Sequence, residues 1–110
     1  MSYNVDLKVN RCEHCKRSDD VEGWHWNYTS NMVPAWRSAG ADLAAFDGKK
    51  ARECAQVLRA AIDNMTARPG FFERFNASNG WGSMHTLLPA LRTLLRGMEE
   101  NPDALVEVSR

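Results

Sequence analysis

The amino-acid sequence predicts an α+β fold, in which a small antiparallel sheet of about three strands is packed by two main helices and short helical turns. An alternating apolar pattern opens the chain, two long stretches with apolar residues at helical spacing occupy its second half, and a short apolar segment closes it. The 110 residues suit one domain over 1–110, and no interior stretch is long enough to be a linker.

The first strand is expected over Tyr3–Asn10, where apolar and polar residues alternate. A second strand is expected over Gly23–Tyr28, with aromatic residues at alternate positions. The two pair most simply as an antiparallel hairpin. The stretch Arg11–Glu22 between them is polar and has no periodicity, so we expect an exposed loop there. The segment Ala104–Val108 predicts a third strand beside the first.

A short helix is expected over Met32–Ala39, with Gly40 as its stop signal. The longest helix is expected to start at Asp47-Gly48 and to run to about Ala67. One side of this helix is apolar and should face the core. The residues of this stripe are Ala51, Cys54, Ala55, Leu58, Ala61, Ile62 and Met65.

The last helix is expected to be capped by Ser83 and to end at Asn101-Pro102. Pro89 falls beyond its first turn, which predicts either a kink or a later start at Thr86. The apolar face of this helix comprises Leu87, Leu88, Leu91, Leu94, Leu95 and Met98.

Charge and composition restrict the class of protein. Fourteen Lys and Arg residues balance fourteen Asp and Glu residues, so the formal net charge is zero. A neutral chain disfavours a phosphate backbone as partner, so nucleic-acid binding is not expected. The chain has no apolar run of membrane-span length, no secretory signal, and three cysteines, an odd number. We therefore expect a cytoplasmic protein that does not bind membranes.

The sharpest local pattern is Cys12-Glu13-His14-Cys15. Two cysteines at this spacing are half of a tetrahedral zinc site, because both thiolates of one tight turn can reach one metal. Two further ligands are needed, so a structural zinc would take at most four ligands from Cys12, Cys15, His14 and His25. The alternative is a pair of exposed thiols in a polar loop with no cofactor. Cys54 lies on an apolar stripe, which favours a buried, inert thiol over a ligand or nucleophile.

The aromatic residues offer two further hypotheses. Those of the second strand suit a core face better than a platform for stacking bases. In Asn79-Gly80-Trp81-Gly82, the tryptophan stands between glycines, so that it either plugs a gap or anchors a partner protein. The candidates for partner binding are Trp81, Asn79 and Trp36.

Several of these motifs together resemble a family of small uncharacterised proteins of bacteriophages and prophage-like bacterial genes. The resemblance covers nearly the whole chain, and its most specific parts are Asn27-Tyr28-Thr29 and Asn79-Gly80-Trp81-Gly82. In that family the Cys pair is present in some members and replaced in others, which implies that metal binding is optional. The family pattern implies an unbroken last helix, and this chain departs from that pattern at Pro89.

The resemblance implies a genomic context and no activity. We therefore expect a non-catalytic accessory protein that binds a host or phage protein, in the host cytoplasm if a phage encodes it. The alternative is a small zinc-stabilised, metal-dependent or thiol enzyme built on Cys12 and Cys15. A nucleic-acid-binding module is a third, less favoured hypothesis.

Overall fold

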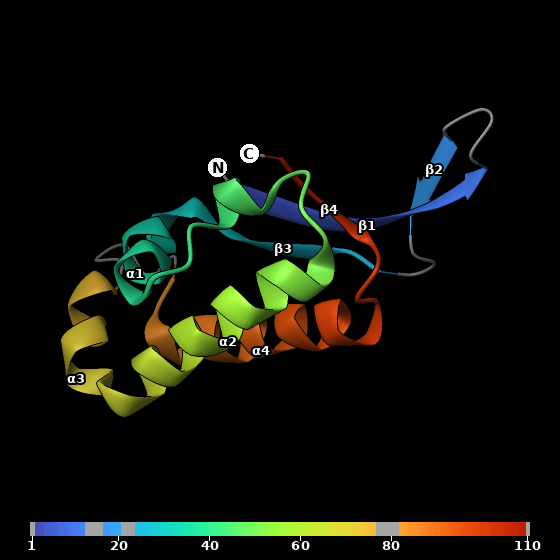
Figure 1. Cartoon of the computed structure of the whole chain (residues 1–110). Coiled ribbons are helices and arrows are strands. Elements are labelled where there is room, and N and C mark those ends of the chain that lie inside the picture. The colour runs from blue at the N-terminus through green and yellow to red at the C-terminus, as the bar shows by residue number, and fades with distance from the viewer. Residues whose placement is uncertain (1, 13–16, 21–23, 77–81, 110) are drawn as a thin grey trace.

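The computed structural model describes residues 2–12, 17–20, 24–76 and 82–109 and has the predicted α+β architecture (Figure 1). The strands are β1 (Ser2–Cys12), β2 (Arg17–Asp20), β3 (Trp26–Thr29) and β4 (Leu105–Ser109). The helices are α1 (Val33–Ala39), α2 (Ala51–Ala67), α3 (Pro69–Phe72) and α4 (Met84–Glu100), with 3-10 turns η1 (Ser30–Met32), η2 (Leu43–Phe46) and η3 (Glu73–Phe75).

Strand β1 organises the sheet because it pairs with each of the other strands, always antiparallel. Its residues 2–5 pair with β3, residues 4–8 pair with β4, and residues 8–12 pair with β2. The predicted pairing of the N-terminal strand with the aromatic strand and with the C-terminal strand is confirmed. Tyr3, Val5 and Leu7 are buried, so the alternating pattern of β1 gives the sheet one apolar face.

The prediction of a loop over Arg11–Glu22 is wrong in part. β1 continues to Cys12, and Arg17–Asp20 forms β2. In Figure 1, β2 and the end of β1 that pairs with it extend beyond the helices, so this part of the sheet has no helix to pack against. A strand pair held mainly by its backbone ladder needs no apolar face, and the side-chain pattern therefore gave no signal for it.

The two long helices cover the apolar face of the sheet and lie side by side (Figure 1). The predicted apolar stripe of α2 is confirmed, since all seven of its residues are buried. The helix begins at Ala51, later than the predicted start at Asp47-Gly48. The carboxylate of Asp47 is engaged elsewhere, because its Oδ1 accepts the backbone N–H of Val108 in β4 at 2.9 Å.

Helix α4 begins at Met84 and contains Pro89, so the alternative of a start at Thr86 is wrong. The side chain of Ser83 does not cap the helix. Asn76 supplies that oxygen instead, because its Oδ1 accepts the N–H of Met84 at 2.8 Å. Four of the six predicted apolar residues are buried, and Leu88 and Leu95 are partly buried.

The aromatic residues around β3 attach the sheet to α4. The indole of Trp24 lies against Gly97, and Trp26 Nε1 donates a hydrogen bond to the carbonyl oxygen of Ala90 at 2.7 Å. The hydroxyl of Tyr28 is 2.5 Å from Oγ1 of Thr86. These contacts confirm that the alternating aromatic residues pack toward the core.

Candidate functional site

The face of the sheet opposite the helices is its most distinctive surface. Side chains alternate along a strand, so the residues that lie between the buried residues of β1 point away from α2 and α4. All of these side chains are at least partly exposed, and nearly all are polar. We call this surface the open sheet face; it comprises Ser2, Asn4, Asp6, Lys8, His25, Asn27, Thr29, Leu105, Glu107 and Ser109.

Hydrogen bonds between strands order part of the open sheet face. The Asn27 side-chain amide donates from Nδ2 to Asn4 Oδ1 at 2.8 Å and to Ser2 Oγ at 3.2 Å. One row further along, His25 Nδ1 is 2.8 Å from Asp6 Oδ1. Side chains held in this way have already lost rotamer freedom, which lowers the entropic cost of binding a partner.

The charges of this face are mixed, with an acidic centre. Asp6 of β1 and Glu107 of β4 occupy directly opposed positions. Like charges in such positions repel, and His25 on the other side of Asp6 offsets that repulsion when its ring is protonated. The hydrogen bond to Asp6 uses the Nδ1 side of the ring. The surface therefore presents carboxylate and amide oxygens, together with the imidazole of His25, to a partner.

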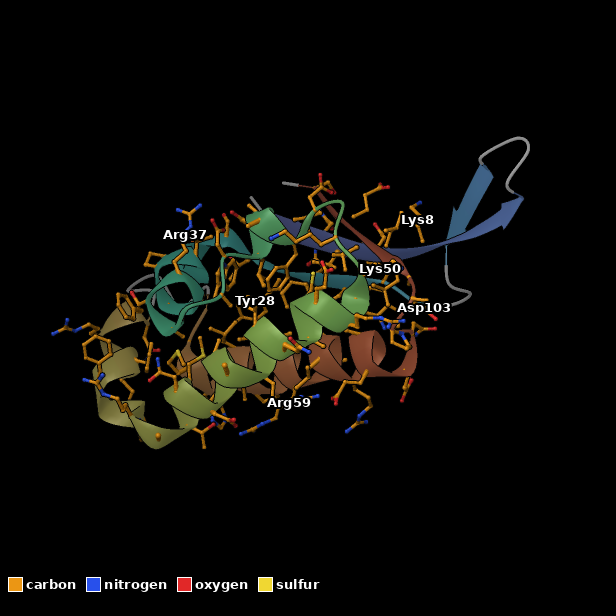
Figure 2. All side chains as sticks on the ribbon, in the orientation of Figure 1. Lys8, Tyr28, Arg37, Lys50, Arg59 and Asp103 are labelled. Atoms are coloured by element: carbon orange, nitrogen blue, oxygen red, sulfur yellow. The ribbon has the colours of Figure 1, made fainter. Side chains whose placement is uncertain are left out.

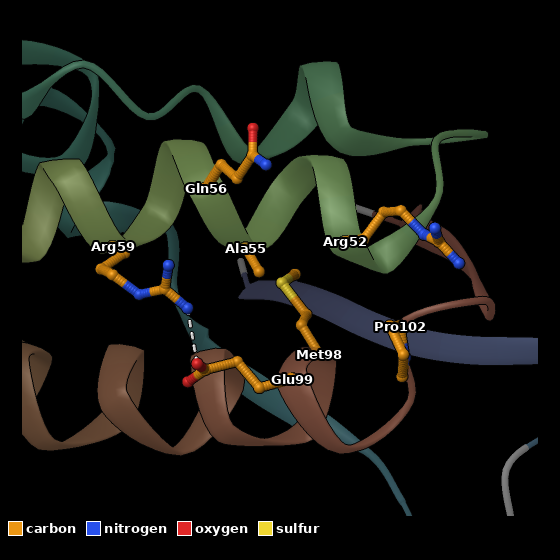
Figure 3. Close-up of a pocket in the computed structure, with 7 residues that line it drawn as sticks. All are labelled: Arg52, Ala55, Gln56, Arg59, Met98, Glu99 and Pro102. Atoms are coloured by element: carbon orange, nitrogen blue, oxygen red, sulfur yellow. Dashed lines mark hydrogen bonds and ion pairs between the residues drawn. The ribbon is translucent and has the colours of Figure 1, made fainter.

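A groove between α2 and α4 is a second candidate (Figure 3). Its volume is about 260 Å³. Arg59 pairs with Glu99 across it at 2.5 Å, and Arg52 pairs with Asp103 at its end. Because both guanidinium groups already have carboxylate partners, the groove has little net charge to attract an anionic ligand. Its lining residues are Arg52, Ala55, Gln56, Arg59, Met98, Glu99 and Pro102.

A second pocket, of about 240 Å³, lies where α2, α3 and the start of α4 meet. Met65, Met84 and Leu88 give it an apolar lining, with His85 and Glu73 among its other residues. The pocket therefore has the shape of a binding site for a small ligand.

The predicted metal ligands are only partly described. Cys12 is the last residue of β1 and pairs with Arg17, whereas His14 and Cys15 lie outside the described residues. His25, the fourth candidate, is engaged with Asp6. In the described ranges no group of three or more His, Cys, Asp or Glu residues could hold a metal ion. A zinc site at Cys12 and Cys15 stays a prediction.

Of the three predicted partner-binding residues, only Trp36 lies within the described part of the chain. Asn79 and Trp81 lie outside the described residues. Trp36 is fully buried in α1, with its ring edge-on to Tyr3 at a centroid distance of 5.2 Å. The proposal that Trp36 contacts a partner is therefore wrong, because α1 turns this side chain into the core.

The thiol of Cys54 is buried, as predicted, with Sγ 3.8 Å from the carbonyl oxygen of Phe46. Burial raises the pKa of this thiol from its ordinary 9.0 to about 11. The group is therefore protonated at neutral pH, and a protonated thiol is a poor nucleophile.

Sequence reasoning missed the Asp6–His25 pair and the bonds of Asn27. These residues are the polar ones that alternate with apolar residues in the two predicted strands, so the sequence indicates that they share the exposed face of the sheet. The register between β1 and β3 could not be predicted, because the residues between these strands include the unexpected strand β2. Pairing Val5 with Trp26 is what places Asp6 next to His25.

No helix in the described part of the chain is both long and apolar enough to span a lipid bilayer. Comparisons of the chain with protein-family models, with curated proteins and with solved structures find no match.

Proposed function

We propose that this protein is a small, non-catalytic accessory protein that binds another protein through the open sheet face and acts in the cytoplasm. The resemblance of the sequence to phage proteins suggests a host or phage protein as the partner. The observation that carries the proposal is the row of cross-strand hydrogen bonds on a sheet face that no described helix covers.

The chemistry of the face favours a protein over other partners. Sites for small molecules are concave, and the two pockets described above are lined by residues of α2, α4 and their flanking segments. A nucleic acid would meet the opposed carboxylates of Asp6 and Glu107, which repel phosphate groups. A protein surface with donor groups, especially Arg or Lys side chains, complements both the carboxylates and the amide oxygens of this face.

Site-specific photo-crosslinking in an extract of the organism that encodes the chain tests the proposal. A photoreactive amino acid at Glu107 should give one discrete adduct, because this residue is exposed on the open sheet face at the middle of β4. The same amino acid at Gln56, exposed beside the α2–α4 groove, should not give that adduct.

Charge variants show whether the adduct depends on the face. Asp6→Lys should abolish the Glu107 adduct, and Asp63→Lys, an exposed change of equal charge on α2, should leave it intact. Adducts of equal yield from Glu107 and Gln56, or an adduct insensitive to Asp6→Lys, would contradict the assignment of the face. Once the adduct is identified, calorimetry with the purified partner measures the loss of affinity directly.

A further inference from the structure

The outer edge of β3 differs from that of β4. Strand β1 lies between β3 and β4. The edge of β4 that faces away from β1 is covered by residues 47–49, which precede α2. Val106 donates its N–H to the carbonyl oxygen of Lys49 and accepts the N–H of Gly48, both at 2.8 Å. Asp47 accepts the N–H of Val108. The edge of β4 is therefore closed to further strands.

The same bonds determine the direction of the polar atoms in the whole sheet. In an antiparallel strand, successive residues direct their N–H and C=O groups to alternate sides. Val106 directs them away from β1, so its neighbour Glu107 directs them toward its β1 partner, Asp6. Val5, the neighbour of Asp6, therefore directs its groups to the other side of β1, toward β3.

On β3 the alternation continues. Val5 is paired with Trp26, so Trp26 and Tyr28 bond to β1. Asn27, between them, directs its backbone N–H and C=O outward. In the ranges that the structure describes, no backbone group is hydrogen-bonded to these two atoms. Asn27 is also exposed.

Natural proteins protect such edges with charged side chains, with proline, or with a covering segment. The edge of β4 has the covering segment, and β2, Arg-Ser-Asp-Asp, is charged. Strand β3, Trp-Asn-Tyr-Thr, contains neither a charged residue nor proline. The edge of β3 is thus the part of the described sheet that is best suited to accept another strand.

We propose that the outer edge of β3 pairs antiparallel with the same edge of a second copy of the chain, so that Asn27 of each copy faces Asn27 of the other. An antiparallel pair of identical edges is self-complementary and closes at two copies. The edge residues are uncharged and the net charge of the chain is zero, so no net repulsion opposes the pairing. The two open sheet faces would then form one continuous surface, although the pairing does not depend on the proposed partner.

Opposed positions across a two-fold axis allow a charge test. We expect the wild-type chain to dimerise with rising concentration in sedimentation experiments, with the weak affinity typical of small interfaces. Asn27→Lys and Asn27→Asp should each be monomeric, because like charges then face each other. An equimolar mixture of the two variants should restore the dimer. Ser109→Lys, on the same face but in β4, is the matched control and should remain dimeric.

A covalent test does not depend on charged variants. With Cys12 and Cys15 replaced by Ser, Asn27→Cys should form an interchain disulfide under oxidised glutathione, since directly paired residues lie within disulfide range. Ser109→Cys should not form one. A wild-type chain that stays monomeric into the high micromolar range overturns the proposal. Dimers of either charged Asn27 variant alone, or equal disulfide yields at positions 27 and 109, overturn it as well. Far-UV circular dichroism verifies that each variant is folded.

Discussion

The contact between Trp24 and Gly97 allows a substitution whose effect on stability changes sign with its background. Gly97 is buried in α4, and a Cβ atom added there would lie 2.1 Å from Nε1 of Trp24 and 2.5 and 2.6 Å from two ring carbons. Alanine in a helix interior is normally more stable than glycine by about 1 kcal/mol. Overpacking of this kind costs roughly 1–3 kcal/mol. Gly97→Ala should therefore lower the free energy of unfolding by up to about 2 kcal/mol.

In a Trp24→Ala background the ring is gone and the cost of overpacking disappears. Gly97→Ala should then raise the free energy of unfolding by about 1 kcal/mol, the usual gain in helix propensity. The coupling between the two sites is the overpacking cost itself, about 1–3 kcal/mol. Urea unfolding followed by far-UV circular dichroism measures all four proteins without relying on tryptophan fluorescence. Equal stabilisation by Gly97→Ala in both backgrounds would refute the reasoning.

Three further predictions concern the core and the cysteines. Leu58→Ala and Leu91→Ala should each cost roughly 2–5 kcal/mol in urea unfolding, and losses below about 1 kcal/mol at both positions would contradict the packing described here. Because the pKa of Cys54 is raised to about 11 in the folded chain, the unfolded chain loses this proton first as the pH rises. Between about pH 9 and 11 wild type should thus lose about 2 kcal/mol more stability than Cys54→Ala, and parallel unfolding curves would argue against that. Cys12→Ser and a chelator should each leave the melting temperature unchanged, because only two zinc ligands are assured. The free energy of unfolding should change by less than about 0.5 kcal/mol. A matching drop with both treatments would establish a bound metal.

The parts of the fold that could be predicted are those with an apolar period. Tyr3, Val5 and Leu7 alternate, and their burial defines one face of the sheet. The stripe through Leu58 places α2 on that face with the same certainty. In both cases the residues that make the apolar pattern are the residues of the core, so the pattern alone predicts the element and its buried side.

The other parts of the fold depend on contacts that produce no apolar periodicity in the sequence. Strand β2 is held by pairing with β1, and its Arg, Ser and Asp residues look like those of a loop. Asp47 has the sequence signature of a helix cap, but α2 begins at Ala51, because the carboxylate of Asp47 accepts a hydrogen bond from Val108 of β4, 61 residues away in the chain. The burial of Trp36 could not be predicted either, because the seven residues of α1 make too few turns to define a buried side.

The placement of Asn27 shows how one register decides the core, the open sheet face and the sheet edge together. The aromatic side chains of Trp26 and Tyr28 reach α4 only if these two residues face the helices. Given that orientation, Asn27 must point its side chain to the open sheet face and its backbone groups outward. A slip of one residue would expose both aromatic rings and bury the amide, at a cost of several kcal/mol. The surface that we propose for binding is therefore specified by the same aromatic contacts that hold the sheet to α4.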